Sequence, residues 1–190
     1  NTPDSLDEEG RLMKHCIGDG NYDMHLKTGK REYFSFRTGT CPLLTLEVRN
    51  QIIEQIEGNN REDPDSQWLP YIADMILDMA WEPYSNDVFR TGLIKDIQAC
   101  YYAINKLPNG LHLRGDLDLS SMKCEVRLPE NTEVEGSLDL SHIQSLTSLP
   151  DGLKAKELDI SSCSQIETID AEIHISGTFT IVDCPKFKSL

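Results

Sequence analysis

The sequence predicts an α+β fold in which a helical N-terminal domain, residues 1–105, caps a short solenoid, residues 106–190. Two observations predict it. A Leu-Pro start stands at residues 107, 128 and 149, with a degenerate copy at 169, so the starts lie 21, 21 and 20 residues apart. Before these copies, apolar residues recur at helical spacing. A repeat of this length cannot bury its own apolar side, so we expect about four coils stacked on one another.

Each start is followed by a second landmark in which apolar residues alternate with polar ones. The four copies are Leu117-Asp118-Leu119-Ser120, Leu138-Asp139-Leu140-Ser141, Leu158-Asp159-Ile160-Ser161 and Phe179-Thr180-Ile181-Val182. Alternate side chains of a strand point to opposite faces, so Leu117 and Leu119 are expected in the core while Asp118 and Ser120 face water. Each coil could contain one strand or two, which leaves both a curved horseshoe and a straighter β-solenoid open.

The run from Leu158 to Ile166, with Cys163 in its sixth position, resembles a leucine-rich repeat. With the Leu-Pro-x-Gly-Leu starts, the short period is similar to the LPX-type repeats of secreted bacterial effectors, such as the invasion plasmid antigen H ubiquitin ligases and Yersinia outer protein M. This chain differs from those repeats in an inserted Gly-x-Leu-Asp-Leu at Gly115 and Gly136, and in the position where they carry Asn. Here that position holds Met122, Ile143, Cys163 and Cys184.

The N-terminal part is expected to be mainly helical. Ser5-Leu6-Asp7-Glu8 has the form of a capping box, which predicts a helix to about Ile17. Apolar spacing predicts further helices over 45–57, 69–81 and from Ser85 to about 105, with a loop over 59–67. Alternation over 22–26 and 33–36 suggests a small hairpin around Thr28-Gly29. Residues 42–53 also resemble the opening helix of an F-box, which would dock on a ubiquitin-ligase adaptor.

The formal net charge of −14 argues against nucleic acid as a partner, because contact with a phosphate backbone requires basic patches. Both parts share this charge, with 10 Lys and Arg against 18 Asp and Glu before residue 106, and 8 against 14 from residue 106 onward. We therefore expect a protein partner with a basic or neutral surface. No apolar run approaches the roughly 18 residues that a membrane helix needs, so no membrane span is expected.

The six cysteines form no CxxC pair and have no His at metal-ligand spacing, so we expect reduced thiols, a cytosolic location, no metal and no cofactor. They are Cys16, Cys41, Cys100, Cys124, Cys163 and Cys184. The chain begins at Asn1 and ends at Leu190, where a fifth start would fall. We expect it to be a piece of a longer protein whose repeat array continues.

The aligned carboxylates of Asp118, Asp139 and Asp159 are the main candidate site. Stacked strands lie about 4.8 Å apart, so these groups are expected to form a ladder that attracts Lys or Arg side chains. Ser120, Ser141, Ser161 and Thr180 would supply neighbouring hydrogen-bonding groups. The alternative is that the three carboxylates are solvated strand positions that discourage edge pairing.

No catalytic residues are predicted. Gly29-Lys30 lacks the preceding Gly and following Ser or Thr of a phosphate loop. A nucleophile and base could be drawn from His15, Cys16 and His25, but the sequence supplies no third group to orient them. The effector ligases use a Cys-x-Asp motif, and no cysteine of this chain has Asp two residues after it.

We therefore expect a protein-recognition module without catalytic activity. The resemblance implies a bacterial effector in the cytoplasm of a host cell, holding a host protein on the concave face of its solenoid. The alternative is the substrate-recognition part of an enzyme, such as a ubiquitin-ligase-like effector, with its activity in residues 1–105 or in a missing C-terminal part.

Overall fold

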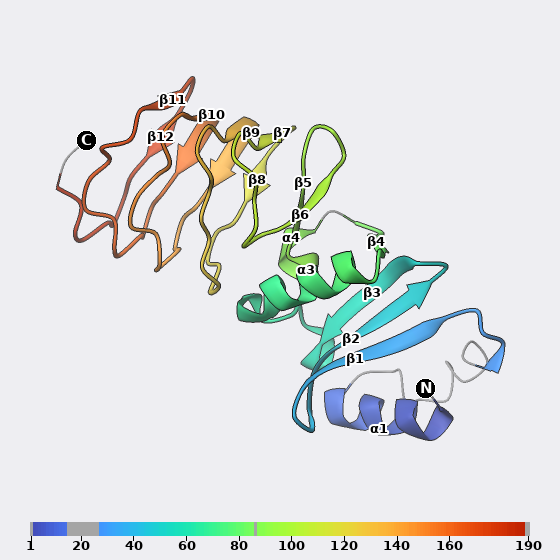
Figure 1. The fold of residues 1–190 in the computed structure, drawn as a ribbon. Helices are drawn as coiled ribbons and strands as arrows, with labels where there is room; N and C mark the ends of the chain where they lie inside the picture. The colour runs from blue at the N-terminus through green and yellow to red at the C-terminus, as the bar shows by residue number, and fades with distance from the viewer. Residues whose placement is uncertain (1, 15–26, 86, 189–190) are drawn as a thin grey trace. The chain divides into compact units, whose positions relative to one another are not determined.

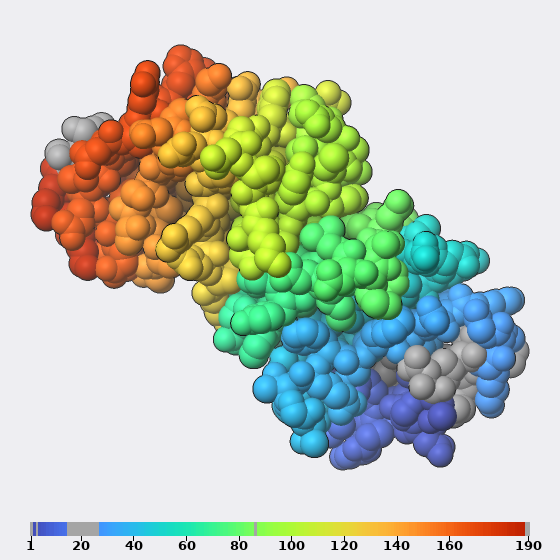
Figure 2. Space-filling view, viewed as in Figure 1, coloured from blue at the N-terminus to red at the C-terminus, as the bar shows by residue number. Residues whose placement is uncertain are grey.

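The computed structural model describes residues 2–14, 27–85 and 87–188 and divides the chain into two compact units, residues 1–91 and 92–190 (Figure 1; Figure 2). Helices and strands are both present, which confirms a mixed α+β fold. The division lies earlier than the boundary expected near residue 105. The reason is a hairpin over residues 93–103 that hydrogen-bonds to the first repeat.

The first unit is a four-stranded sheet with helices on its two faces (Figure 1). The strands lie in the order β1-β2-β3-β4, antiparallel except for the parallel pair β3 and β4. The elements are α1 (Pro3–Met13), β1 (Glu32–Thr38), β2 (Cys41–Arg49), β3 (Ile52–Gly58), α3 (Leu69–Asp78), β4 (Glu82–Pro83) and α4 (Val88–Thr91), with 3-10 turns at Asn59–Arg61 and Ser66–Trp68. The unit is therefore less helical than expected.

Helix α1 is confirmed, but it begins before the expected cap at Ser5. Thr2 is the N-cap: its hydroxyl accepts the Ser5 N–H at 3.2 Å, and Ser5 Oγ accepts the Thr2 N–H at 2.8 Å. Ser5 is thus the last residue of the capping box rather than its first. The helix ends at Met13, short of Ile17, with Lys14 in the left-handed region at φ 54°.

Residues 45–57 form two antiparallel strands instead of the expected helix. β2 and β3 meet at Asn50 and Gln51, whose φ values of 50° and 65° have the signs that a type I′ turn requires. Val48 and Ile53 are register partners, so apolar residues at helical spacing lie side by side across a hairpin. The F-box interpretation, which needs a helix here, is therefore wrong.

The helix expected over 69–81 is confirmed as α3, and the segment before it is irregular apart from the 3-10 turns. Two ring contacts join this region to β1. The centroids of Phe34 and Trp81 lie 4.6 Å apart and those of Phe36 and Trp68 lie 6.4 Å apart. Residues 33–36 are a strand as predicted, and they pair with β2. The expected partner strand at 22–26 lies outside the described residues.

Residues 85–105 do not form a third helix, because α4 is a single turn and Gly92 follows it with φ 66°. β5 (Leu93–Lys95) and β6 (Tyr101–Ala103) form a hairpin instead. The carboxylate of Asp96 closes its loop by accepting two backbone N–H groups at 2.8 Å. The Ile97 N–H donates to the His112 carbonyl at 2.9 Å. Within this unit the neighbour of the first coil is thus a hairpin rather than a helical cap.

The second unit is a β-solenoid whose parallel strands stack coil upon coil (Figure 1). Four strand layers are joined by three turns of about 21 residues, and we call them coil 1 (107–127), coil 2 (128–148), coil 3 (149–168) and coil 4 (169–188). The strands are β7 (His112–Leu113) and β8 (Leu117–Asp118) in coil 1, β9 (Glu133–Asp139) in coil 2, β10 (Leu153–Asp159) in coil 3, and β11 (Ile173–Ile175) and β12 (Phe179–Thr180) in coil 4. The expected solenoid is confirmed.

Inward rows of the coils form the core, as the alternation predicts. Leu119, Leu140 and Ile160 are each 0% exposed and occupy one such row. Coil 2 has 21 residues and coil 3 has 20. The additional residue lies in β9, where Glu135 and Gly136 together stand opposite the single residue Lys156 of β10. A Cβ on Gly136 would lie 2.6 Å from the carbonyl carbon of Gly115, so this close approach of two coils requires glycine.

The turn at Asn50 and Gln51 gives a test of the hairpin. We expect Gln51→Gly to raise the free energy of unfolding of the first unit by about 0.5 kcal/mol, since glycine avoids the left-handed strain that Gln51 carries. In a helix the same change would cost about 1 kcal/mol. Both tryptophans, Trp68 and Trp81, lie in this unit, so fluorescence in a urea titration reports its unfolding.

The matched control is Gln67→Gly, at an exposed position in a 3-10 turn. A loss of stability in Gln51→Gly as large as that in the control would contradict the hairpin.

Candidate functional site

The predicted carboxylate ladder is present on the outward face of the solenoid sheet. Asp118 pairs in register with Asp139, Asp139 with Asp159, and Asp159 with Thr180. Asp118 is exposed and the others are half-buried. Of the serines two residues after each aspartate, Ser141 is buried, with 8% exposed, and Ser120 and Ser161 are half-buried. The structure thus brings the aspartates and Thr180 into one row.

Each aspartate of the ladder also shapes the turn that follows its strand. One carboxylate oxygen, Oδ1, accepts the N–H of the serine two residues on, at 2.8 Å in coil 1, 2.9 Å in coil 2 and 2.7 Å in coil 3. The next residue in each coil is left-handed, with φ between 57° and 60° at Ser121, His142 and Ser162. These are Asx turns, which the Asp-x-Ser spacing could have indicated. The carboxylates therefore have a structural role and are held in fixed positions.

Two further carboxylates lie in the adjacent outward row. Asp116 accepts the backbone N–H of Ser137 at 2.7 Å, and Glu157 accepts the Ser137 hydroxyl at 3.1 Å. With the ladder they form a strip of five carboxylates, which we call the acidic strip: Asp116, Asp118, Asp139, Glu157 and Asp159. Asp116 and Glu157 were not predicted from the sequence because they precede the Leu-Asp-Leu landmark.

The opposite end of the same strands carries mixed charge. His112, Glu133 and Lys154 are consecutive register partners, with Lys154 Nζ 3.4 Å from Glu133 Oε2. His112 Nε2 lies 3.2 Å from a carboxylate oxygen of Glu135. Unlike the acidic strip, this end therefore has charges of both signs within ion-pair distance.

In coils 3 and 4, a cysteine occupies the position at which leucine-rich repeats carry Asn. The side chain at this position lies inside the coil. The thiol of Cys163 lies 3.2 Å from the Leu140 carbonyl of the preceding coil, and that of Cys184 lies 3.2 Å from the Ile160 carbonyl. Burial raises the pKa of Cys163 to about 11. Cys163 is therefore a protonated donor between coils rather than a nucleophile. The five described cysteines are all free thiols.

A groove of about 360 Å³ lies on another side of the solenoid, between the segments that follow the strands of coils 1 and 2. Its lining includes Val126, Leu128, Leu146 and Leu149 together with Glu125 and Arg127. The groove thus joins apolar side chains to charged and hydroxyl groups, and its exposed lining is mainly polar.

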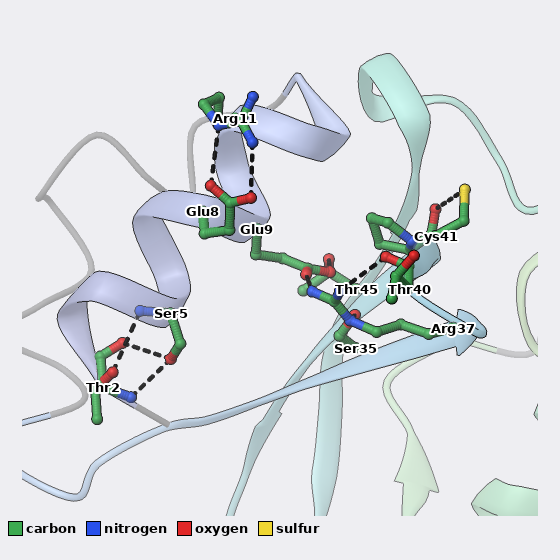
Figure 3. A network of polar contacts seen from close by, with 11 residues as sticks. Thr2, Ser5, Glu8, Glu9, Arg11, Ser35, Arg37, Thr40, Cys41 and Thr45 are labelled. Atoms are coloured by element: carbon green, nitrogen blue, oxygen red, sulfur yellow. Dashed lines mark hydrogen bonds and ion pairs between the residues drawn. The ribbon is translucent and has the colours of Figure 1, made fainter.

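In the first unit, polar side chains gather between α1 and the sheet (Figure 3). Glu9 is 3% exposed, forms an ion pair with Arg37, and accepts the hydroxyl of Thr45 at 3.0 Å. Arg37 also donates to Ser35 Oγ at 2.8 Å and to the Thr40 carbonyl at 3.2 Å. A cavity of about 100 Å³ adjoins this network, well below the 300 Å³ or more of typical ligand pockets.

A second buried pair lies on the same sheet. Glu47, 5% exposed, forms an ion pair with Arg31, whose guanidinium also lies 3.3 Å from Glu54. Burial raises the pKa of Glu47 and raises that of the neighbouring Tyr33 to about 12, while the Arg31 charge acts in the lowering direction on both. The buried acids of this unit are thus neutralised by arginines within it.

The other candidates give no site. Gly29, with φ 61°, is a turn residue beside an exposed Lys30. His15, Cys16 and His25 lie outside the described residues. Among the residues that the structure describes, no three His, Cys, Asp or Glu side chains are grouped so that they could hold a metal ion. Within the same residues, no helix has the length and apolar character needed to cross a membrane.

Comparison with protein-family models, curated protein sequences and solved structures gives no significant match to this chain. Functional conclusions therefore rest on its own residues.

The Asx turns predict different effects for two substitutions of one aspartate. Asp139→Asn retains a side-chain oxygen that can accept the Ser141 N–H, so the stability of the second unit should stay within about 0.5 kcal/mol of the parent. Asp139→Ala leaves that N–H without its acceptor and should cost about 1 kcal/mol. Thermal unfolding followed by far-ultraviolet circular dichroism measures both variants.

Tryptophan fluorescence supplies an internal control, because both tryptophans lie in the first unit and their transition should stay unchanged. Lys156→Ala, at an exposed outward position of coil 3, is the control for loss of a side chain. Equal stability of the Ala and Asn variants would contradict the structural role of the carboxylate.

Proposed function

We propose that the chain is a protein-recognition module that binds its partner on the outward face of the solenoid sheet, centred on the acidic strip. The observation that carries the proposal is the register of Asp118, Asp139 and Asp159, which places three like charges on adjacent strands. Adjacent strands are separated by about 4.8 Å, so the strip presents negative charge at a regular spacing. Lys and Arg side chains of a partner would reduce the repulsion within it.

Preorganisation supports this surface as a binding site. Each ladder carboxylate is fixed by its Asx turn through Oδ1, so its second oxygen, Oδ2, is outside that turn bond. A surface whose groups are already ordered loses less conformational entropy on binding. Ser120 and Thr180 would add hydrogen-bonding groups at its margin.

The solenoid is further proposed to be a leucine-rich-repeat array. Coil length, the Leu-x-Leu strands and the inter-coil thiol contacts of Cys163 and Cys184 support it. By that resemblance the protein would be a bacterial effector acting in the cytosol of a host cell. The free thiols are compatible with a reducing compartment.

An enzyme remains the second candidate, and the polar network around Glu9 and Arg37 is the observation that favours it. Its cavity of about 100 Å³ adjoins charges that already neutralise each other. The network is accounted for by the burial of α1 against the sheet, so recognition has the stronger support.

The first experiment is affinity capture from a eukaryotic cell lysate, with the full chain as bait beside Asp118→Asn/Asp139→Asn/Asp159→Asn. Asparagine keeps the turn acceptor and removes the charge, so binding is tested without disturbing the fold. We expect the variant to lose the proteins that the parent retains. Titration calorimetry of a purified partner should show binding weakened at least about tenfold, and the loss should be smaller at high salt.

The matched control removes three exposed carboxylates elsewhere in the unit: Glu125→Gln/Glu130→Gln/Glu172→Gln. The control should bind like the parent. Equal loss in both variants would indicate an effect of net charge alone, and loss only in the control would move recognition to the groove beside Glu125. Either result rejects the acidic strip.

A further inference from the structure

The outward face of the solenoid sheet changes charge from one end of its strands to the other. The ladder aspartates are each the last residue of a strand, and no Lys or Arg stands among residues 116–118, 137–139 or 157–159. The residues that precede them carry three cations and two carboxylates. These are Arg114, Lys154 and Lys156 with Glu133 and Glu135, and together with His112 we call them the mixed end. One end of the face is thus anionic, while the other has a small excess of positive charge with His112 counted as neutral.

Two cations of the mixed end have no partner among the residues that the structure describes. Lys154 forms an ion pair with Glu133, with 3.4 Å between Nζ and Oε2. Arg114 and Lys156 differ: both are exposed, and within the described residues their side chains form no ion pair and no hydrogen bond. Their positive charges are therefore available to a group from outside the chain.

Arg114 and Lys156 lie on the two sides of Glu135. Lys156 of β10 stands opposite Glu135 and Gly136 of β9. On the other side of β9, Arg114 and Glu135 are the residues that follow the last register pair of β7 and β9. Glu135 itself lies 3.2 Å from His112 Nε2. One carboxylate can offset only one of the two cations, so one further carboxylate would balance the charge here.

The separation of the two ends sets the spacing that a partner must match. Lys156 precedes Asp159 by three residues in β10, which is about 10 Å at the rise of a strand. The Debye length is about 8 Å at physiological ionic strength, so a charged group over one end is largely screened from the other. A partner in extended conformation would therefore carry its opposite charges about three residues apart.

We propose that the segment bound on the outward face has segregated charge, with Lys or Arg over the acidic strip and Asp or Glu over Arg114 and Lys156. This arrangement rests on the recognition proposed above for the acidic strip, and it fixes how the bound segment is oriented along the strands. A uniformly basic segment would bring like charges against Arg114 and Lys156, and such a contact rejects a wrong partner. A segment whose charges alternate could not match both ends.

Calorimetric titration of the full chain at low salt with three synthetic peptides, blocked at their termini, tests the proposal. The segregated peptide is Lys-Lys-Lys-Gly-Gly-Glu-Glu, the rearranged peptide of the same composition is Lys-Glu-Gly-Lys-Gly-Glu-Lys, and the basic peptide is Lys-Lys-Lys-Gly-Gly-Gln-Gln. We expect the parent to bind the segregated peptide at least about threefold more tightly than the rearranged one. Asp118→Asn/Asp139→Asn/Asp159→Asn should weaken binding of the segregated and basic peptides at least about threefold.

Arg114→Gln/Lys156→Gln tests the mixed end separately from the acidic strip. Its preference for the segregated over the rearranged peptide should disappear. The basic peptide should bind this variant more tightly than it binds the parent, because two like charges have been removed. Damage to the fold would not produce a gain in affinity. The matched control Arg127→Gln/Lys188→Gln removes two exposed cations elsewhere in the unit and should keep the preference.

Failure of charge segregation and failure of the acidic strip give different results. Binding that is unchanged in the aspartate variant, or no binding of any peptide at about 1 mM, rejects the acidic strip and the segregated partner together. If the aspartate variant loses binding but the parent binds the segregated and rearranged peptides equally, only segregation is rejected. A preference that survives Arg114→Gln/Lys156→Gln, or that is lost equally in the control, also rejects segregation alone.

Discussion

Hydrogen bonding between coils is the constraint on which the second unit depends. No coil can bury its apolar side alone, so each must present its backbone to a neighbour at the spacing of a parallel sheet. Leu119, Leu140 and Ile160 donate in turn to carbonyls of the following coil, at 2.8 to 3.1 Å. The same register that stacks these inward residues aligns the outward ones. A row of identical side chains on the surface is thus a consequence of the row inside.

This constraint explains how the same aspartates can stabilise the turns and also serve the proposed recognition. The chain must turn sharply after each strand, and a carboxylate that accepts an N–H two residues on stabilises that turn. Repetition of the turn in three coils repeats the carboxylate, which creates a line of like charge. Such a line raises the free energy of the isolated protein through repulsion, and a cationic partner would lower it. Structure and recognition are therefore not competing explanations of the same residues.

The solenoid could be predicted from the sequence because its evidence is repeated four times over residues 107–190. The first unit offered each signal once. Val48, Ile52 and Ile56 fit a helical face as well as they fit two strands, and the turn between them uses Asn50-Gln51 where Asn-Gly would have been recognised. Asp96 stabilises the β5–β6 loop by accepting hydrogen bonds from two backbone N–H groups. The spacing of apolar residues in the sequence does not indicate these bonds. At the site, the ladder was predicted correctly, while Asp116 and Glu157 were missed because only the register of adjacent coils brings them to it.

Charge is distributed differently in the two units, and this difference supports the surface proposed for partner recognition. In the first unit, the buried acids Glu9 and Glu47 are paired with Arg37 and Arg31, so their charge is neutralised within the unit. In the solenoid, the mixed end of the sheet has its own ion pair at Glu133 and Lys154. The five carboxylates of the acidic strip accept hydrogen bonds from backbone N–H groups and from one serine hydroxyl. Those hydrogen bonds orient the negative charge without neutralising it, and no ion pair among residues 2–14, 27–85 and 87–188 joins these carboxylates to a Lys or Arg, which is the electrostatic basis of the proposed binding of cationic groups.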